Sequence, residues 1–311
     1  MAVHHVRPER RTLRGSFDRE YEPILTIDPG DTVIYQTLDA GWDEEARDRD
    51  GAATDMERDA ERDAGHALCG PVAIRGARAG DVLQIEIGAI RPGSWGWTWT
   101  GPRPWMTVFD FAVQDEVRLI WDLDPGIGVG TTRDDPIVTV GLRPFMGVMG
   151  NALAEPGPHS TTPPRAVGGN IDCRELISGS TLWLPVEVEG ALFSVGDGHA
   201  RQGDGEVGQT AIECPMDLVE LTFHVRPDLA LTMPEAETPA GYITFGFADS
   251  LDDATNMAVN RMLNHLEDEY DFSRARALAL ASLVVDLRVT QIVNSVSGVH
   301  ALLPRDAIRL A

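Results

Sequence analysis

The chain has 311 residues, enough for one large or two medium domains with a substantial hydrophobic core. Asp and Glu outnumber Arg by 49 to 26, and the formal net charge of −23 argues against nucleic acid and anionic membranes as partners. Lysine is absent, which excludes Schiff-base, P-loop and Ser–Lys chemistry. Its absence also excludes the amidase-signature and nitrilase types of amidase, which require a catalytic lysine.

The first 14 residues are rich in Arg and His and have no apolar h-region, so they do not predict a signal peptide. No stretch reaches the ~18 consecutive apolar residues that a membrane span needs. The three cysteines, Cys69, Cys173 and Cys214, are far apart and form no CxxC pair. We therefore expect a reduced, cytoplasmic protein.

Most of the chain predicts short strands separated by Gly, Pro and Asp. Apolar and polar residues alternate over 32–37, 81–90, 117–123, 181–188, 219–225 and 242–247. Alternation over five to eight residues indicates one buried and one exposed face, as in antiparallel sheets. We predict a mainly β fold with antiparallel sandwich or barrel-like sheets and a smaller C-terminal α/β portion.

The last part of the chain has a different pattern. Ala254, Ala258, Met262 and Leu266 are four residues apart, which predicts a helix over 252–267. Ser273 is typical of the N-cap of a second helix to about residue 283, and residues 285–289 then alternate as a strand. We therefore divide the chain into a mainly β catalytic region (1–235) and a C-terminal α/β portion packed against it (236–311).

Two segments of the first half have unusual compositions. Residues 43–63 are dense in Asp, Glu and Arg, which is typical of a solvated helix or a mobile loop. Trp95, Trp97 and Trp99 are spaced two apart and Trp105 follows. Alternate residues of a strand share a face, so these rings could pack in the core, wall a small substrate site or contact a second copy of the chain.

Groups able to catalyse a reaction concentrate between residues 159 and 213. Asp197 and His199 end an apolar strand, and residues two apart in an extended chain point the same way, so they predict half of a metal site. By the same spacing, Gln202, Asp204 and Glu206 would share one face. So many neighbouring carboxylates repel one another unless a cation or shared protons compensate them. A solvated acidic loop is the alternative interpretation.

The same residues carry a family resemblance. The chain contains GGN followed by Asp172, then LPVEVEGALFSVGDGHA, QGDGE and TAIE in this order. This block resembles the acetamidase/formamidase family, and flanking segments at 25–31, 37–40, 70–83 and 286–291 are similar to it as well. A departure occurs at His66-Ala67, where the family usually has Asn-Pro. The tryptophan-rich segment and residues 42–65 also depart from the family pattern.

The resemblance implies a mainly β fold and hydrolysis of small aliphatic amides, such as formamide or acetamide, to carboxylate and ammonia. It also implies a divalent metal, with zinc as the first candidate and calcium as the second. We expect a homo-oligomer with a small-molecule amide substrate and no nucleic-acid or membrane partner. The positions that match the family motif are Asn170, Asp172, Asp197, His199, Gln202, Asp204, Glu206 and Glu213.

We interpret these positions as a site for amide hydrolysis by a metal-activated water. Asp172, Asp197 and His199 are the expected metal ligands, and Glu206 or Glu213 is the expected proton carrier. Asn170 would stabilise the oxyanion together with backbone N–H groups. The candidates for substrate binding are Gly168, Gly169, His159 and Gln202.

Two alternatives remain open. Cys173 or Cys214 could act as the nucleophile, although free cysteines are usually small buried hydrophobic residues. The chain could also be a metal-containing β protein that binds a small polar ligand without amidase activity. A site needed for stability alone would not require so many carboxylates beyond the four ligands that zinc usually takes.

Overall fold

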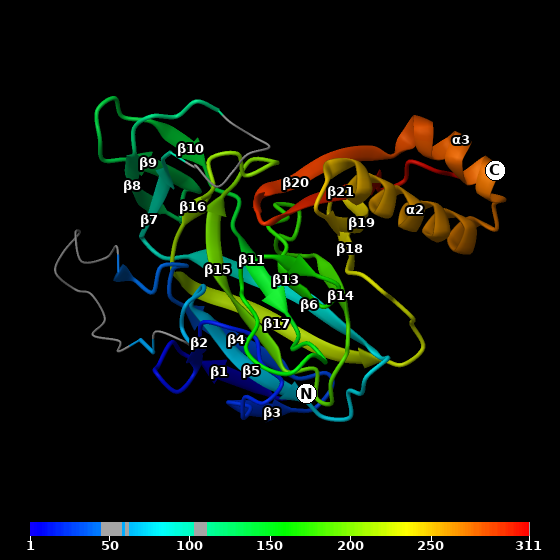
Figure 1. Cartoon of the computed structure of the whole chain (residues 1–311), viewed down its shortest axis with the longest axis horizontal. Helices are drawn as coiled ribbons and strands as arrows, with labels where there is room; N and C mark the ends of the chain where they lie inside the picture. The colour runs from blue at the N-terminus through cyan, green and yellow to red at the C-terminus, as the bar shows by residue number, and fades with distance from the viewer. Residues whose placement is uncertain (45–57, 60–61, 103–110, 311) are drawn as a thin grey trace.

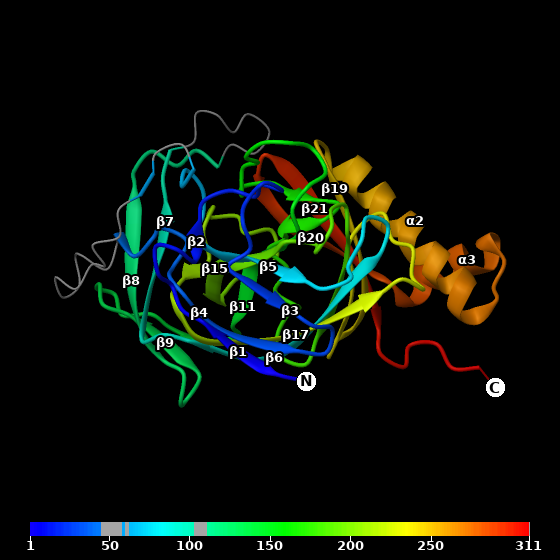
Figure 2. The same ribbon diagram turned by 90° about the horizontal axis from the view of Figure 1, so that it is seen from below.

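The computed structural model describes residues 1–44, 58–59, 62–102 and 111–310. Most of the predicted charged segment 43–63 lies outside these residues, and so does Trp105. Within the described residues the strands form two large sheets whose pairs are antiparallel, except for β1–β4 and β3–β5. The expected mainly β architecture is confirmed, and Figures 1 and 2 show it from two sides.

The first sheet combines strands from both ends of the chain. Its order is β1 (Val3–Val6), β4 (Thr32–Thr37), β17 (Met216–Arg226), β6 (Val82–Pro92), β14 (Thr181–Pro185), β18 (Glu235–Thr238), β19 (Gly241–Ala248), β21 (Val296–Pro304) and β20 (Asp286–Asn294). The six predicted strands are present, five of them here and β8 in the second sheet. Because β14 pairs with β18, this sheet runs across the predicted division at residues 235 and 236, which stays a prediction.

The second sheet carries GGN, GDGHA and the Glu of TAIE from the sequence block described above. Its main path is β10 (Thr139–Gly141), β9 (Val129–Thr132), β8 (Val117–Asp124), β7 (Trp95–Thr100), β16 (Ile212–Glu213), β15 (Phe193–Arg201), β11 (Phe145–Gly150), β13 (Gly168–Asn170) and β12 (Pro164–Arg165). Strand β5 (Leu68–Ile74) also pairs with β15, and β2 (Leu13–Arg14) and β3 (Leu25–Ile27) pair with β5. Strand β15 is therefore central, with partners on both sides.

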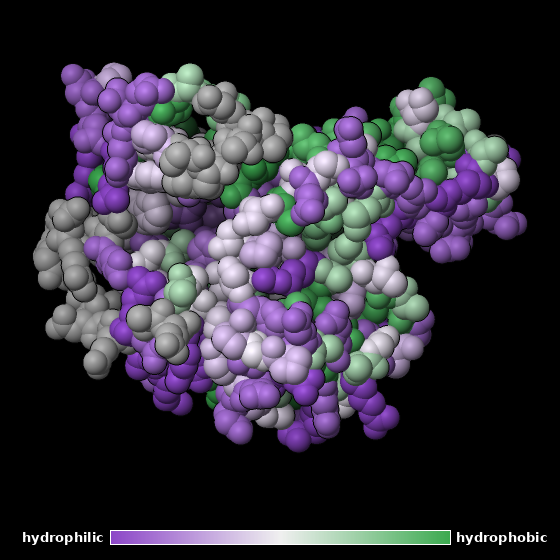
Figure 3. Space-filling model, viewed as in Figure 1, coloured by the Kyte–Doolittle hydropathy of each residue, from purple (hydrophilic) through white to green (hydrophobic). Residues whose placement is uncertain are grey.

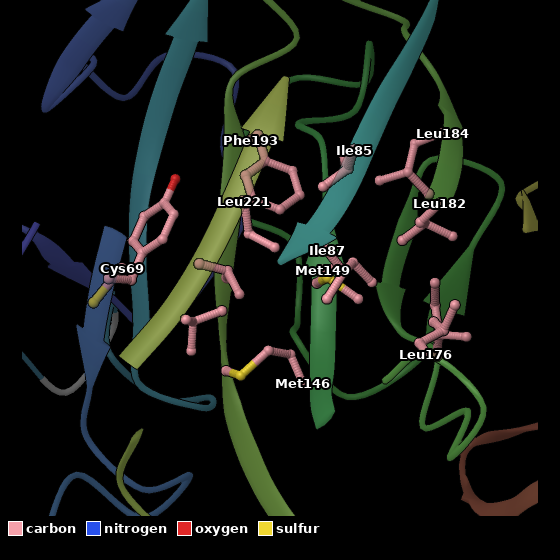
Figure 4. Close-up of a cluster of buried hydrophobic side chains, with 14 of the residues drawn as sticks. Cys69, Ile85, Ile87, Met146, Met149, Leu176, Leu182, Leu184, Phe193 and Leu221 are labelled. Atoms are coloured by element: carbon pink, nitrogen blue, oxygen red, sulfur yellow. The ribbon is translucent and has the colours of Figure 1, made fainter. Parts of the chain in front are cut away.

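The main hydrophobic core fills the space between the two sheets. Figure 4 shows Phe193 of β15 lying among Leu221 and Ile85 of the first sheet. Phe193 also meets the ring of Phe223 edge-on, with 5.1 Å between ring centroids. The alternation that predicted β4, β6 and β17 supplies the inward faces of this core.

The two helices pack against β19 and β21 of the first sheet, and Figure 1 shows them projecting to one side of the molecule. Helix α2 (Leu251–Tyr270) buries the predicted stripe of Ala254, Ala258, Met262 and Leu266. Helix α2 lies so close to β19 that position 246 of the strand requires glycine. A Cβ on Gly246 would lie 2.0 Å from the carbonyl oxygen of Ala254 in the helix. None of the helices in the described part of the chain is both long and apolar enough to cross a membrane.

Helix α3 (Arg274–Val284) begins as predicted after Ser273, whose side chain accepts a hydrogen bond from the N–H of Arg276. Its outer face is unusually apolar. Leu278 and Leu283 are exposed, and hydrophobic side chains are visible at this end of the molecule in Figure 3. The predicted strand after the helix is present as β20.

Substituting Phe193→Ala should lower the free energy of unfolding by about 3–5 kcal/mol, because it removes a fully buried ring between the sheets. The matched control is Phe111→Ala, where the ring is 53% exposed and the expected change is within ~0.5 kcal/mol. Urea unfolding followed by tryptophan fluorescence measures both. Equal effects of the two substitutions would contradict this description of the core.

Candidate active site

A cavity of about 380 Å³ lies beside the central strands of the second sheet. Six polar or ionisable side chains in its walls are almost fully buried. They are Asn170 on β13, Asp197 and His199 on β15, Glu206 in the loop after β15, Glu213 on β16 and Asn294 at the end of β20. Five of the expected site residues, which are all of these six except Asn294, therefore line one cavity.

His199 is the centre of this group. Its Nε2 lies 3.3 Å from Oδ1 of Asp197 and 3.2 Å from Oε2 of Glu213. Glu213 is brought there by pairing of β15 with β16, which places it directly opposite His199. One ring nitrogen thus faces two carboxylates that are both buried.

The opposite ring nitrogen of His199 has a defined partner. Gln202 donates its Nε2–H to the carbonyl oxygen of Asp172 at 2.8 Å, so its Oε1 is free to accept. This Oε1 lies 2.9 Å from Nδ1 of His199, which therefore donates. As a result, Nε2 of a neutral His199 presents a lone pair to the carboxylates of Asp197 and Glu213. That arrangement is repulsive unless a proton or a cation lies between them.

Asp172 stands on the Nδ1 side of the imidazole ring. Its Oδ1 is 3.9 Å from Nδ1, which Gln202 already occupies, and its Oδ2 accepts a short hydrogen bond from Nδ2 of Asn294. Asp172, His199 and Glu206 form a second group of close ligand-type atoms. Oδ1 of Asp172, Oε2 of Glu206 and Oε2 of Glu213 are buried without a hydrogen-bond partner.

Gly147 on β11 provides the space into which two of these carboxylates point. A Cβ at this position would lie 2.4 Å from Oδ2 of Asp197 and 2.6 Å from Oδ1 of Asp172. It would also approach Cε1 of His199 to 2.9 Å. All three expected metal ligands therefore surround one glycine.

Burial and mutual repulsion shift the ionisation of the group. Burial raises the pKa of Glu213 to about 7 and that of Asp172 to about 6. Burial and the charge of Asp172 raise the pKa of Glu206 well above its usual range. Burial opposes the charged form of His199, but Glu213 and Asp197 raise its pKa well above the ordinary value. Burial likewise opposes ionisation of Asp197, but its pKa is lowered overall, chiefly by His199.

The backbone of the site is strained. Asp172, Asp197 and Glu206 have φ values of 51°, 59° and 47°, in the left-handed region. Such conformations cost ~1–3 kcal/mol each in non-glycine residues and are found mainly at functional sites. The Asp197 and His199 side chains do meet, as their spacing predicts, although Asp197 is not in a regular extended conformation.

Several expected positions lie elsewhere. Gln202, Asp204 and Glu206 do not share one face, because the chain turns after β15: Gln202 supports His199 and Glu206 enters the cavity. Asp204 lies 3.6 and 3.7 Å from the guanidinium groups of Arg174 and Arg288. Gln202 thus orients a ligand-type residue instead of facing substrate.

His159, Gly168 and Gly169, which we predicted to bind substrate, do not line this cavity. His159 bridges to Phe17, and its Nε2 lies 2.9 Å from the carbonyl oxygen of Glu155, away from the cavity walls. A Cβ on Gly168 would lie 2.4 Å from the carbonyl oxygen of Met149. The glycine pair therefore allows close packing of β13 on β11 and does not line the cavity.

The cysteines are poor nucleophile candidates. All three are buried, and burial raises the pKa of Cys69 to about 12 and those of Cys173 and Cys214 well above the usual range. Cys173 is close to Glu175 and His300 in a further group of ligand-type side chains. There Glu175 accepts a 2.8 Å hydrogen bond from Arg288, so an arginine already compensates its charge.

His66 and Asn294 contribute to the cavity but are not among the candidates that the sequence motifs predicted. His66 lines it, and its departure from the family pattern was a usable signal. Asn294 holds Asp172 from the β20–β21 hairpin, and no sequence pattern pointed to it. Of the predicted tryptophans, Trp97 also lines the cavity, and its Nε1–H donates to Oδ2 of Asp39 at 2.7 Å.

The pKa shifts predict an unusual pH dependence for the metal-free protein. Glu213 and Asp172 hold protons in the folded state that the unfolded chain releases at lower pH, so stability should fall as pH rises from about 5 to 7. Each such proton contributes a slope of about 1.4 kcal/mol per pH unit. Urea unfolding with chelator at several pH values measures this, and Glu213→Gln should flatten the slope. A slope unchanged by Glu213→Gln would contradict the assignment.

Comparison with known proteins supports the interpretation of these motifs. The acetamidase from Mycolicibacterium smegmatis is 28% identical over 240 residues, and the formamidase from Methylophilus methylotrophus is 26% identical over 234 residues. These alignments cover 58% and 59% of this chain, and the chain spans 58% and 56% of those two relatives.

Solved structures match over nearly the whole chain. The acetamidase from Bacillus halodurans superposes with a TM-score of 0.82 at 28% identity, covering 96% of this chain and 97% of its own. The acetamidase from Yersinia enterocolitica has a TM-score of 0.82 at 25% identity, covering 99% and 93%. The model of the acetamidase/formamidase family matches residues 4–159 and 151–309. The chain therefore belongs to the acetamidase/formamidase family.

Proposed function

We propose that this member of an amidohydrolase family hydrolyses small aliphatic amides of the formamide and acetamide type to carboxylate and ammonia. The observation that carries the proposal is the buried contact of His199 Nε2 with Asp197 and Glu213 at the wall of a cavity. Two carboxylates and one imidazole are a set of ligands typical of a catalytic metal site. Amide hydrolysis is also the reaction after which the acetamidase and the formamidase described above are named.

The side chains fit a divalent cation. Nε2 of His199 faces two carboxylates, and three buried carboxylate oxygens lack a hydrogen-bond partner. We propose Asp197, His199 and Glu213 as residues that would hold the cation, with Asp172 turned toward the same glycine. Zinc is the first candidate because imidazole favours it, and calcium is the second because oxygen ligands predominate. Such a cation would polarise a carbonyl group and lower the pKa of a bound water.

Glu206 is the proposed proton carrier. It lines the cavity, its Oε2 has no hydrogen-bond partner, and burial raises its pKa well above the usual range, which makes its carboxylate a stronger base. Glu206 would take a proton from the attacking water and later donate it to the leaving nitrogen. Glu213, the other expected proton carrier, is in contact with His199 and is assigned here to the cation.

Other side chains keep this arrangement in place. Gln202 fixes the tautomer and orientation of His199, and Asn294 restrains Asp172. Trp97 covers one wall of the cavity and helps to exclude water from the reaction. We also propose a cytoplasmic location, which the three free cysteines support. The exposed apolar residues of α3 support a homo-oligomer.

Purified protein should release ammonia from formamide, acetamide or propionamide, lose this activity with a chelator and regain it with zinc. The substitutions Asp197→Asn and His199→Ala should each reduce kcat/KM at least about 10²-fold, because each removes a proposed ligand. The control is Asp28→Asn, which breaks only an exposed ion pair with Arg75. Bound metal without ammonia release from any of the three amides would favour the non-catalytic ligand-binding alternative.

Gly147→Ala tests the shape of the site without changing an ionisable group. The added methyl must displace the carboxylates of Asp197 and Asp172, so we expect about 10²-fold lower activity and fewer than one metal ion per chain. Gly141→Ala is the matched control, since its nearest neighbour would be Nη1 of Arg201 at 3.9 Å. Ammonia assays and elemental analysis measure the two effects. Full activity of Gly147→Ala would contradict the proposed role of these carboxylates.

A further inference from the structure

His66 is held rigidly at the rim of the cavity. Its backbone N–H donates to Oγ1 of Thr161 at 2.9 Å, and its Nδ1 lies 2.8 Å from the same oxygen. The preceding carbonyl, of Gly65, accepts a 2.8 Å hydrogen bond from Nε1 of Trp42. A Cβ on Gly65 would lie 2.2 Å from Oγ1 of Thr161, so the two segments are in close contact.

These contacts favour one tautomer of the His66 ring. Oγ1 of Thr161 accepts from the backbone N–H of His66, and Nδ1 is the only acceptor that the described residues offer to its single proton. Nδ1 is then an acceptor, and the proton of the neutral imidazole resides on Nε2. Nε2 has no hydrogen-bond partner among the described residues, and His66 lines the cavity. His66 therefore has a free N–H donor.

Asn170 offers the complementary group. Its Nδ2 donates to the carbonyl oxygen of Thr162 at 3.1 Å, whereas its Oδ1 is buried and has no partner. The side chain itself is only 2% exposed, and it lines the same cavity as His66. The consecutive residues Thr161 and Thr162 thus anchor both side chains. His66 is left with a free N–H donor, and Asn170 is left with a free carbonyl acceptor.

We propose that His66 and Asn170 recognise the two ends of a primary amide, a proposal that rests on the amidase function above. The Nε2–H of His66 donates to the substrate carbonyl oxygen, and Oδ1 of Asn170 accepts from the substrate NH2 group. The polarity is opposite to the expected oxyanion-stabilising role of Asn170, because its own NH2 group is already bound to Thr162. His66 supplies the donor to the oxygen that becomes negative in the tetrahedral intermediate.

The pair also defines a substrate class. An ester of the same shape has no N–H to offer, so it would leave the buried Oδ1 of Asn170 without a partner. A site that hydrogen-bonds a substrate group strongly discriminates against analogues without that group. The site is therefore selective for unsubstituted carboxamides over the corresponding esters.

The first test compares acetamide with thioacetamide, whose sulfur is a weak hydrogen-bond acceptor. His66→Ala should lower kcat/KM for acetamide about 10²-fold and should change the value for thioacetamide much less. His66→Gln retains an N–H donor and should recover part of the loss. The control is His224→Ala, a partly exposed histidine on β17 outside the cavity. Equal losses on both substrates, or no loss on acetamide, would overturn the role of His66.

The second test does not depend on turnover. In protein with ¹⁵N-labelled histidine, His66 should appear as the Nε2–H tautomer, and acetamide should shift its Nε2 resonance. The His66→Ala variant identifies the signal. A Nδ1–H tautomer, or no shift at saturating acetamide, would overturn the inference. If wild-type protein released no ammonia but acetamide still shifted this resonance, the proposed hydrolysis would fail while the recognition by His66 would stand.

Discussion

The arrangement of the site depends on the burial of His199 between two carboxylates. Charges this deeply buried are costly unless a partner compensates them, and here Nε2 lies within 3.3 Å of both Asp197 and Glu213. The rest of the local structure serves this contact. Gln202 binds the other ring nitrogen, and Gly147 leaves room for the Asp197 carboxylate. Without Gln202 the His199 ring would lose its orientation, and without Gly147 the Asp197 carboxylate would be displaced from His199.

The site joins the two sheets. Strands β11, β13, β15 and β16 of the second sheet carry most of its groups, whereas Asn294 arrives from β20 of the first sheet. The loop after β15 meets β20 through hydrogen bonds of Gly205 to Thr290 and Ile292. The C-terminal portion is therefore part of the active-site framework as well as a cover for one end of the sheet.

Strands and helices with clear periodicity could be predicted from the sequence, because burial imposes periods of two or four residues on them. The α2 stripe and the Ser273 cap are examples. Local patterns could not reveal that Glu206 and Gln202 diverge, since that depends on a left-handed turn at Glu206. They also could not place Asn294, whose partner is distant in sequence. The spacing of the motif therefore predicts which residues lie near one another, but it does not predict the direction in which each side chain points.

The contact between Asn294 and Asp172 has a consequence for how the site forms. It links residues 122 positions apart, so the restraint on Asp172 requires closure of a very long loop. Folds rich in contacts between residues far apart in the sequence fold slowly. A chain in which only β11 to β16 had assembled would present Asp197, His199 and Glu213 before Asp172 was restrained. Completion of the site, including the restraint on Asp172, is thus tied to completion of the whole topology.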